Sequence, residues 1–268
     1  MTAFDESERR IWAGRADAFA GSFARLCAYP VSRLLDAAGV AEGVRVLDVG
    51  TGTGTAAAAA CGRGARVTAV DAEPSMVARA ARAVPGADVR LAALPELPFA
   101  DGAFDAVVGN FVVNHVGRPR AALAELRRVT RPGGRIAVTV WALPAAAGQA
   151  LLGRAVEAAG VGRPAHLPMV DPGDDFSRTE AGLAGLLDAA GLADAGCETL
   201  RWDHRTTAGE WWSGPASGAA TIGQIVTGQS PEVIEAIKGH FDALCAGFTG
   251  ADGVLSLPHA ALLAHGRA

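Results

Sequence analysis

Apolar, β-branched runs alternate with segments of helical periodicity over residues 44–142. The five runs predict strands, and in chain order they read VRVLDV, RVTAV, DVRLA, FDAVVG and RIAVTVWA. The segments between them predict helices that begin near Gly54, Pro74, Leu94 and Arg118. Strands that alternate with helices in this way form a parallel sheet with helices on both faces. The pattern therefore predicts an α/β fold.

Periodic patterns continue on both sides of this core. Residues 7–38 predict one or two amphipathic helices, and further helices are expected from about Ala145 and over residues 179–190. The segments CETLRWDHRTT and GVLSLPHAALLAHGRA predict two more strands. Residues 208–252, between those two strands, are too long for a hairpin loop in a compact domain. We expect them to form a helical cap.

The chain has 268 residues, half of them hydrophobic, which is enough to bury one full core. We therefore expect a single domain that is divided into an N-terminal helical lid, a cofactor-binding core in two segments and an inserted cap. In residue numbers, these parts are 1–40 for the lid, 41–207 with 253–268 for the core, and 208–252 for the cap.

Charge and composition narrow the range of partners. The net charge of −4 and the scattered arginines leave no basic stripe for a nucleic-acid backbone, so nucleic acid is not an expected partner. No apolar run is long enough to cross a bilayer, and the charged start MTAFDESERR lacks the apolar segment of a signal peptide. We expect a cytoplasmic protein without a membrane partner. The four cysteines form no CxxC pair, which argues against a disulfide framework or a zinc site.

The stretch VRVLDVGTGTG predicts a strand, a glycine-rich turn and the start of a helix. A phosphate-binding P-loop is excluded because such a loop needs a lysine, and the only lysine of the chain is Lys238. Gly50 and Gly52 fit a dinucleotide-binding turn, but Thr55 stands where the third glycine belongs. Asp48 would also repel a pyrophosphate at short range. This carboxylate suits a ligand that carries an ammonium group.

Four segments resemble the class I S-adenosylmethionine-dependent methyltransferases, in the small-molecule branch related to ubiquinone and menaquinone biosynthesis. They are VLDVGTGTG, VTAVDAEPSMV, LPFADGAFDAVVGNFVVNHV and ALAELRRVTRPGGRI, and the resemblance covers residues 40–142. It implies a Rossmann-like, seven-stranded, mostly parallel sheet with helices on both faces, preceded by N-terminal helices. It also implies S-adenosyl-L-methionine as cofactor and S-adenosyl-L-homocysteine as product.

The same resemblance implies a set of cofactor-binding residues. Asp48 faces the methionine end, the glycines let the backbone approach the cofactor, and Asp71 accepts both ribose hydroxyls. An acidic residue that receives the adenine amino group in the family is replaced here by Ala93, so backbone groups near Leu94 are expected to take part. The full set is Asp48, Gly50, Thr51, Gly52, Gly54, Asp71, Ala72, Met76, Ala93, Leu94, Asn110 and Phe111.

The acceptor site is less strongly indicated than the cofactor site. His115 is the candidate general base, with a structural role as the alternative. Trp12, Phe19 and Trp211 join His115 as candidate substrate-binding residues, although Trp211 and Trp212 also suit packing on the core. His166, Asp203 and His204 reach the site only if their loops fold over it. The acidic loop DPGDD has no second acidic cluster, so no metal site is expected.

The expected reaction is O-, N- or C-methylation of a small-molecule acceptor in secondary or quinone-type metabolism. Two other functions stay open at this point. An NAD-dependent oxidoreductase shares the strand, the glycine turn and the ribose acid. A protein that binds S-adenosylmethionine without methyl transfer, such as a regulator or a cyclase, needs the same cofactor residues. A monomer and a homodimer are both compatible with the sequence.

Overall fold

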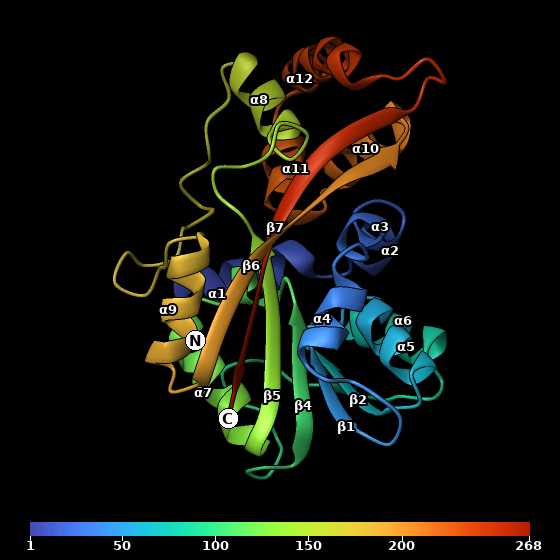
Figure 1. Cartoon of the computed structure of the whole chain (residues 1–268). Helices are drawn as coiled ribbons and strands as arrows, with labels where there is room; N and C mark the ends of the chain where they lie inside the picture. Colours follow the sequence, from blue (N-terminus) through green and yellow to red (C-terminus); the bar gives the residue numbers. More distant parts are fainter.

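A seven-stranded sheet with the order β3-β2-β1-β4-β5-β7-β6 forms the centre of the computed structural model, which describes residues 1–268 (Figure 1). Strands β1 to β5 are parallel, and β7 is antiparallel to both of its neighbours. The predicted fold class is confirmed. The strands are β1 (Arg45–Val49), β2 (Arg66–Asp71), β3 (Asp88–Leu91), β4 (Phe104–Asn110), β5 (Thr130–Trp141), β6 (Ala193–Thr206) and β7 (Leu255–Arg267).

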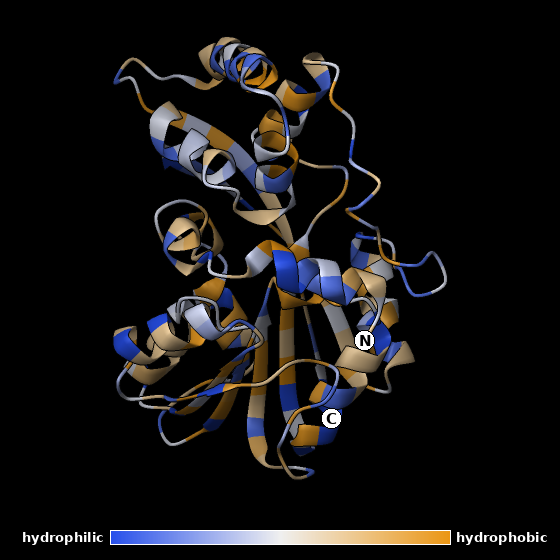
Figure 2. Cartoon of the chain, turned by 180° about the vertical axis from the view of Figure 1, so that it is seen from behind, coloured by the Kyte–Doolittle hydropathy of each residue, from blue (hydrophilic) through white to orange (hydrophobic).

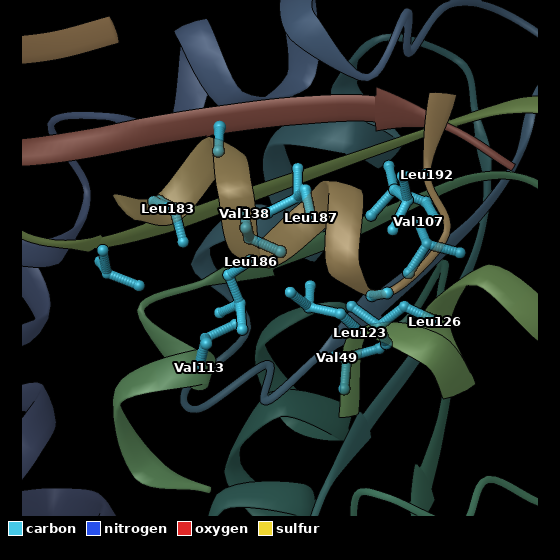
Figure 3. Close-up of a cluster of buried hydrophobic side chains, with 14 of the residues drawn as sticks. Val49, Val107, Val113, Leu123, Leu126, Val138, Leu183, Leu186, Leu187 and Leu192 are labelled. Carbon is cyan, nitrogen blue, oxygen red and sulfur yellow. The ribbon is translucent and has the colours of Figure 1, made fainter. Parts of the chain in front are cut away.

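Helices cover both faces of the sheet, as the alternating pattern predicts. One face carries α4 (Val31–Ala37), α5 (Thr55–Gly62) and α6 (Pro74–Ala83), and the other carries α7 (Pro119–Val129) and α9 (Glu180–Ala189). Because side chains alternate along a strand, Leu47 and Val49 of β1 join the cluster under α7 and α9, whereas Val46 joins the cluster under α4 and α5. Figure 3 shows the α7 and α9 leucines packed against strand valines. No helix has both the length and the apolar composition needed to cross a membrane.

Strands β6 and β7 are long and extend beyond the parallel strands, where four helices gather on them (Figure 1). These helices are α8 (Leu151–Ala158), α10 (Ala208–Ala216), α11 (Ala220–Thr227) and α12 (Pro231–Cys245). They share a hydrophobic cluster with the near end of β7, centred on Phe241, Ile237 and Trp211. Figure 2 shows these helices banded in apolar and polar colours, typical of amphipathic helices packed on one side. This helical lobe combines the segment between β6 and β7 with α8 from earlier in the chain.

The N-terminal segment forms four short helices rather than the one or two that the periodicity predicts. They are α1 (Ala3–Trp12), α2 (Ala16–Ala20), α3 (Ala24–Cys27) and α4. Gly14, with a φ of 69°, ends the first helix, and Pro30, which lacks an amide donor, precedes the last. The breaks let the chain fold around the carboxyl edge of the sheet instead of running past it.

The helix expected near Leu94 is absent, and that prediction is wrong. Residues 92–103 form turns with an isolated bridge between Ala93 and Glu96. Pro95 and Pro98 each lack an amide hydrogen and disfavour helical geometry in the residue before them, which outweighs the local apolar spacing. The helix expected from about Ala145 begins later, at Leu151. The helices expected near Gly54, Pro74 and Arg118 form as α5, α6 and α7.

Candidate functional site

A cavity of about 770 Å³ lies at the carboxyl ends of the parallel strands, between the sheet, the N-terminal helices and the helical lobe. This edge is where ligands of open α/β sheets bind. Of the sequence-predicted residues, only Gly54 is missing from its wall. The predicted residues that line it are Trp12, Phe19, Asp48, Gly50, Thr51, Gly52, Asp71, Ala72, Met76, Ala93, Leu94, Asn110, Phe111, His115 and Trp211.

Asp48 is a buried carboxylate in the cavity wall with no cationic partner in the protein. The residue is 1% exposed and lines the cavity. Its Oδ2 accepts a hydrogen bond of 2.7 Å from the Thr51 hydroxyl, whereas Oδ1 is sealed from solvent and unpartnered. Burial raises the pKa of Asp48 to about 6. A buried carboxylate without a cationic partner is costly, so the site favours a cationic group near Asp48.

Asp71 ends β2 and holds the glycine turn of the neighbouring strand. Its Oδ2 accepts the amide hydrogen of Gly52 at 2.8 Å, and its Oδ1 accepts that of Glu73 at 3.0 Å. Burial is the main influence on the pKa of Asp71, which is raised. Each carboxylate oxygen keeps one lone-pair direction free, so Asp71 can still accept from two hydroxyl groups of a ligand.

The glycine turn depends on backbone conformations that favour glycine. Gly50 and Gly52 have φ angles of 67° and 55°. A Cβ atom at Gly50 would lie 2.5 Å from Cγ2 of Val112. Gly54, which we expected at the cofactor, lies outside the cavity wall: it has a φ of 91°, and a Cβ there would lie 2.9 Å from Cγ2 of Val84. It packs α5 closely on the end of α6, and its expected contact with the cofactor stays a prediction.

Ala72, Met76, Ala93 and Leu94 line one end of the cavity, and Met76 is 4% exposed. Ala93 provides no carboxylate. Glu96, its partner in the isolated bridge, lines the same end and does provide one. Sequence reasoning missed Glu96. The turn that brings it opposite Ala93 depends on the nearby prolines and belongs to no motif.

Asn110 ends β4, and Phe111 follows it in a strained, hydrogen-bonded corner. Asn110 donates from Nδ2 to the Cys27 carbonyl at 2.7 Å and accepts at Oδ1 from the Thr139 hydroxyl at 2.7 Å. Phe111 has a φ of 61°, an uncommon conformation for a bulky residue, and its ring stacks on Trp141 at 4.1 Å. The Asn110 amide therefore fixes the corner to α3, and Phe111 presents an aromatic face to the cavity.

His115 lies in the short 3₁₀ helix Val112–His115 and is paired with a residue from α1. Its Nδ1 is 2.7 Å from Oε2 of Glu8, which also accepts a hydrogen bond of 3.2 Å from Nε1 of Trp12. Glu8 is only 7% exposed, and the rings of Trp12 and His115 meet edge to face at 5.5 Å. A carboxylate that accepts from Nδ1–H leaves Nε2 free to take a proton. Sequence reasoning missed Glu8. The available signal was its position four residues before Trp12, which places a charged side chain on the apolar face of the predicted helix.

Aromatic side chains close the end of the cavity that faces the helical lobe. Phe23, Trp141, Trp211 and His259 all line it, and the Trp211 ring lies 5.4 Å from Phe23 and 5.6 Å from His259. Sequence reasoning missed Trp141 and His259. Both lie in strands that were predicted, but their approach depends on the pairing of β5 with β7.

Four other residues considered from the sequence do not line the cavity. His166 and Asp203 are exposed. His204 is 2% exposed and packs behind Trp211, with a ring separation of 5.3 Å. Trp212 packs on Phe241 at 5.2 Å, so it belongs to the core of the helical lobe.

Comparisons with known proteins agree with this architecture. Residues 47–138 match the model of a methyltransferase domain family. A demethylmenaquinone methyltransferase of Renibacterium salmoninarum is 40% identical over 111 residues, which cover 41% of this chain and 47% of that protein. The chain thus matches about half the length of this relative. A demethylmenaquinone methyltransferase of Mycolicibacterium paratuberculosis is 34% identical over 176 residues, covering 63% of this chain and 74% of that protein.

Solved structures share the fold. The YcgJ protein from Bacillus subtilis superposes with a TM-score of 0.57 at 20% identity, covering 89% of this chain and 97% of that one. One assignment follows from three findings. They are the sheet order, the glycine turn with its two strand-end aspartates, and the match to 74% of the length of the Mycolicibacterium paratuberculosis protein. The chain belongs to the class I S-adenosylmethionine-dependent methyltransferase family.

Proposed function

We propose that the protein transfers a methyl group from S-adenosylmethionine to a small-molecule acceptor. The observation that carries this proposal is the buried carboxylate of Asp48, which lines the cavity and has no cationic partner in the protein. An α-ammonium group supplies the cation that this carboxylate lacks. A pyrophosphate, as in NAD, would bring negative charge to a buried carboxylate, so the oxidoreductase alternative is disfavoured.

The remaining cofactor contacts are assigned by chemistry. Asp71, with one free lone-pair direction on each oxygen, suits the ribose diol. The positive φ angles of Gly50 and Gly52 keep side chains away from the space beside the turn. Met76 and Leu94 provide apolar surface for a flat adenine, and the carboxylate of Glu96 suits its amino group. The residues present therefore fit S-adenosylmethionine.

When bound, S-adenosylmethionine supplies an electrophilic methyl group on a sulfonium. After transfer, the remaining part of the cofactor is a neutral thioether. The protein's own task is to align the acceptor and exclude water, and alignment of this kind contributes up to roughly 7–11 kcal/mol. Trp12, Phe19 and Phe111 form apolar walls suited to both purposes. Few dedicated groups are needed beyond them.

The pair of Glu8 and His115 provides proton transfer if the acceptor is a hydroxyl compound. Glu8 holds Nδ1 of His115, and Nε2 is then free to take the hydroxyl proton as general base. His115 is the proposed catalytic residue, and Glu8 is a positioning residue. Because Glu8 comes from α1, the N-terminal helices complete the reaction site as well as cover it.

The acceptor is proposed to be a small, largely apolar molecule of secondary or quinone-type metabolism. The relatives described above are named for demethylmenaquinone, and the aromatic end of the cavity suits a ring system of that general kind. Whether oxygen, nitrogen or carbon receives the methyl group follows from the acceptor that is found.

The test is release of S-adenosylhomocysteine with methyl-labelled S-adenosylmethionine and a panel of quinols, phenols and amines. We expect label in at least one acceptor and a strong loss with Asp48→Asn. Binding of S-adenosylmethionine without release of S-adenosylhomocysteine for every acceptor would support the alternative of a binding protein that does not transfer methyl groups.

A further inference from the structure

His259 reaches the cavity because β7 runs against the direction of the parallel strands. Trp141, the last residue of β5, pairs with Ala261 of β7. His259 lies two residues earlier in β7, so it projects beyond the carboxyl end of β5. The residue is 2% exposed, yet it belongs to the cavity wall. It is therefore a buried imidazole at the place where ligands of this fold bind.

Hydrogen bonding fixes the tautomer of His259. Its Nδ1 lies 2.8 Å from the Leu257 carbonyl oxygen, which can only accept, so Nδ1 carries the hydrogen. Burial is the main influence on the pKa of His259, which is lowered despite the Leu257 carbonyl and Asp203, so the ring is neutral at pH 7. Nε2 then carries a lone pair. It forms no hydrogen bond with the protein, and it is not one of the unpartnered polar atoms that are sealed from solvent. It faces the cavity as a hydrogen-bond acceptor.

Flat aromatic rings surround the imidazole of His259. The distance from the His259 ring centroid to the ring centroid is 6.0 Å for Trp141, 5.6 Å for Trp211 and 6.2 Å for Trp202. His204, at 6.0 Å, is the other titratable ring nearby, and desolvation lowers its pKa to about 4, so it too is neutral at pH 7. This end of the cavity therefore offers aromatic surface together with the neutral Nε2 acceptor of His259.

The charges of the cavity wall add a second restriction. The only lysine or arginine that lines the cavity is Arg9. The acidic residues that line it are Asp5, Glu8, Asp48, Asp71, Glu73 and Glu96. An anionic acceptor would meet repulsion from most of these groups, and no lysine or arginine lines the aromatic end. An uncharged molecule is favoured.

We propose that His259 determines acceptor specificity: its Nε2 accepts a hydrogen bond from a hydroxyl or N–H group on a flat, uncharged aromatic molecule bound between Trp141 and Trp211. That this molecule receives the methyl group rests on the proposed function, but its binding preference does not. His259 thus selects molecules that donate a hydrogen bond at the ring edge and discriminates against equally apolar rings without a donor.

A pair of probes tests this preference without using activity. The dissociation constants of 4-phenylphenol and 4-fluorobiphenyl are measured by equilibrium dialysis at pH 7.5, with and without saturating S-adenosylhomocysteine. The two probes have similar shapes, but only the phenol donates a hydrogen bond. We expect His259→Phe to shift the ratio of the two constants about tenfold against the phenol, the usual effect of one lost neutral hydrogen bond.

Three more variants make the result decisive. His259→Asn keeps an amide for the Leu257 carbonyl and is expected to lose the preference, whereas His259→Gln places an acceptor near Nε2 and is expected to keep part of it. His204→Phe changes the neighbouring histidine behind the wall and should leave the ratio as in the parent. Circular dichroism identifies the variants that fold, and the comparison uses those.

The proposal is overturned if folded His259→Phe and His259→Asn keep the parent ratio, if His204→Phe shifts the ratio as strongly, or if 4-phenylphenol does not bind the parent. Calorimetry with S-adenosylmethionine separates this outcome from failure of the proposed function. A protein that prefers the phenol but does not bind S-adenosylmethionine retains this inference and loses the proposed methyl transfer.

Discussion

Glu8 of α1 and His115 at the end of the 3₁₀ helix after β4 lie 107 positions apart in the chain, and their Oε2 and Nδ1 atoms are 2.7 Å apart. The same α1 helix is tied to the next residues of this loop, because the Gly117 amide donates to Asp5 Oδ1 at 2.6 Å. The candidate base is thus oriented by the N-terminal helix that forms part of the cavity wall. The helix α1 therefore both covers the site and holds the candidate base.

His115→Ala should lower the methylation rate of a hydroxyl acceptor by about 10²–10⁴-fold at neutral pH, the typical value of general-base assistance. Cofactor affinity should stay close to that of the parent, and activity should partly recover at higher pH as the acceptor ionises unaided. Steady-state rates from pH 6 to 10 check this. Glu8→Gln should lower kcat less than His115→Ala does. Full activity of folded His115→Ala across this range would assign His115 a structural role.

S-adenosylhomocysteine should bind more tightly as the pH rises from 5 to 7. Burial raises the pKa of Asp48 to about 6, so the carboxylate is mostly protonated at pH 5 and mostly ionised at pH 7, where it attracts the ligand's ammonium group. The expected change in affinity is about tenfold. Titration calorimetry at several pH values measures it. Asp48→Asn should lose most of the slope, and an equal slope in parent and variant would point to Asp71 or another group.

Asp48 should also destabilise the empty protein at neutral pH. Its folded-state pKa, about 6, lies above the ordinary value of 3.8, so the folded state binds the proton more tightly. The resulting stability is complete below pH 3.8 and is lost as the pH rises through 6. Asp48→Asn should therefore be more stable than the parent by up to about 3 kcal/mol at pH 7.5, with a smaller difference at pH 4.5. Urea unfolding at both pH values tests the sign: a parent more stable than the variant at pH 7.5 would contradict it.

Gly54→Ala should destabilise the fold by about 1–3 kcal/mol through overpacking against Val84 and a strained left-handed backbone. Gly185→Ala in α9 is the matched control, because a Cβ there meets nothing within 4 Å and alanine favours the helix by about 1 kcal/mol. Thermal unfolding should show the first variant below the parent and the second above it. Unchanged stability of Gly54→Ala would mean that the start of α5 adjusts freely.

The sheet and its paired helices could be predicted because the signals are local. Strands β1 and β4 are short, largely buried apolar runs, and the turn after β1 carries its own glycines. The strand-end aspartates Asp48 and Asp71 follow from the same runs, since parallel strands end at one edge of the sheet. The absent helix at Leu94 shows the limit, because two prolines override an apolar spacing that otherwise fits a helix.

The acceptor end depends on contacts between distant segments, and no local pattern marks these. Glu8 reads as one charge among many on an amphipathic helix until α1 folds against His115. His259 reads as a polar residue in a strand until the antiparallel register of β7 carries it past Trp141. Gly54 belongs to the local motif, and the structure adds that its position also packs against Val84 and Ala80.

Calorimetry of cofactor binding tests the central claim most directly. The parent should bind S-adenosylmethionine and S-adenosylhomocysteine and should not bind NAD, because Asp48 and Asp71 suit an ammonium group and a ribose diol without an intervening pyrophosphate. Asp71→Ala should weaken S-adenosylhomocysteine binding by about 1.5–3 kcal/mol through loss of charge-assisted hydrogen bonds. An Asp71→Ala variant that binds as tightly as the parent, or a parent that binds NAD in preference to both methionine derivatives, would contradict the account.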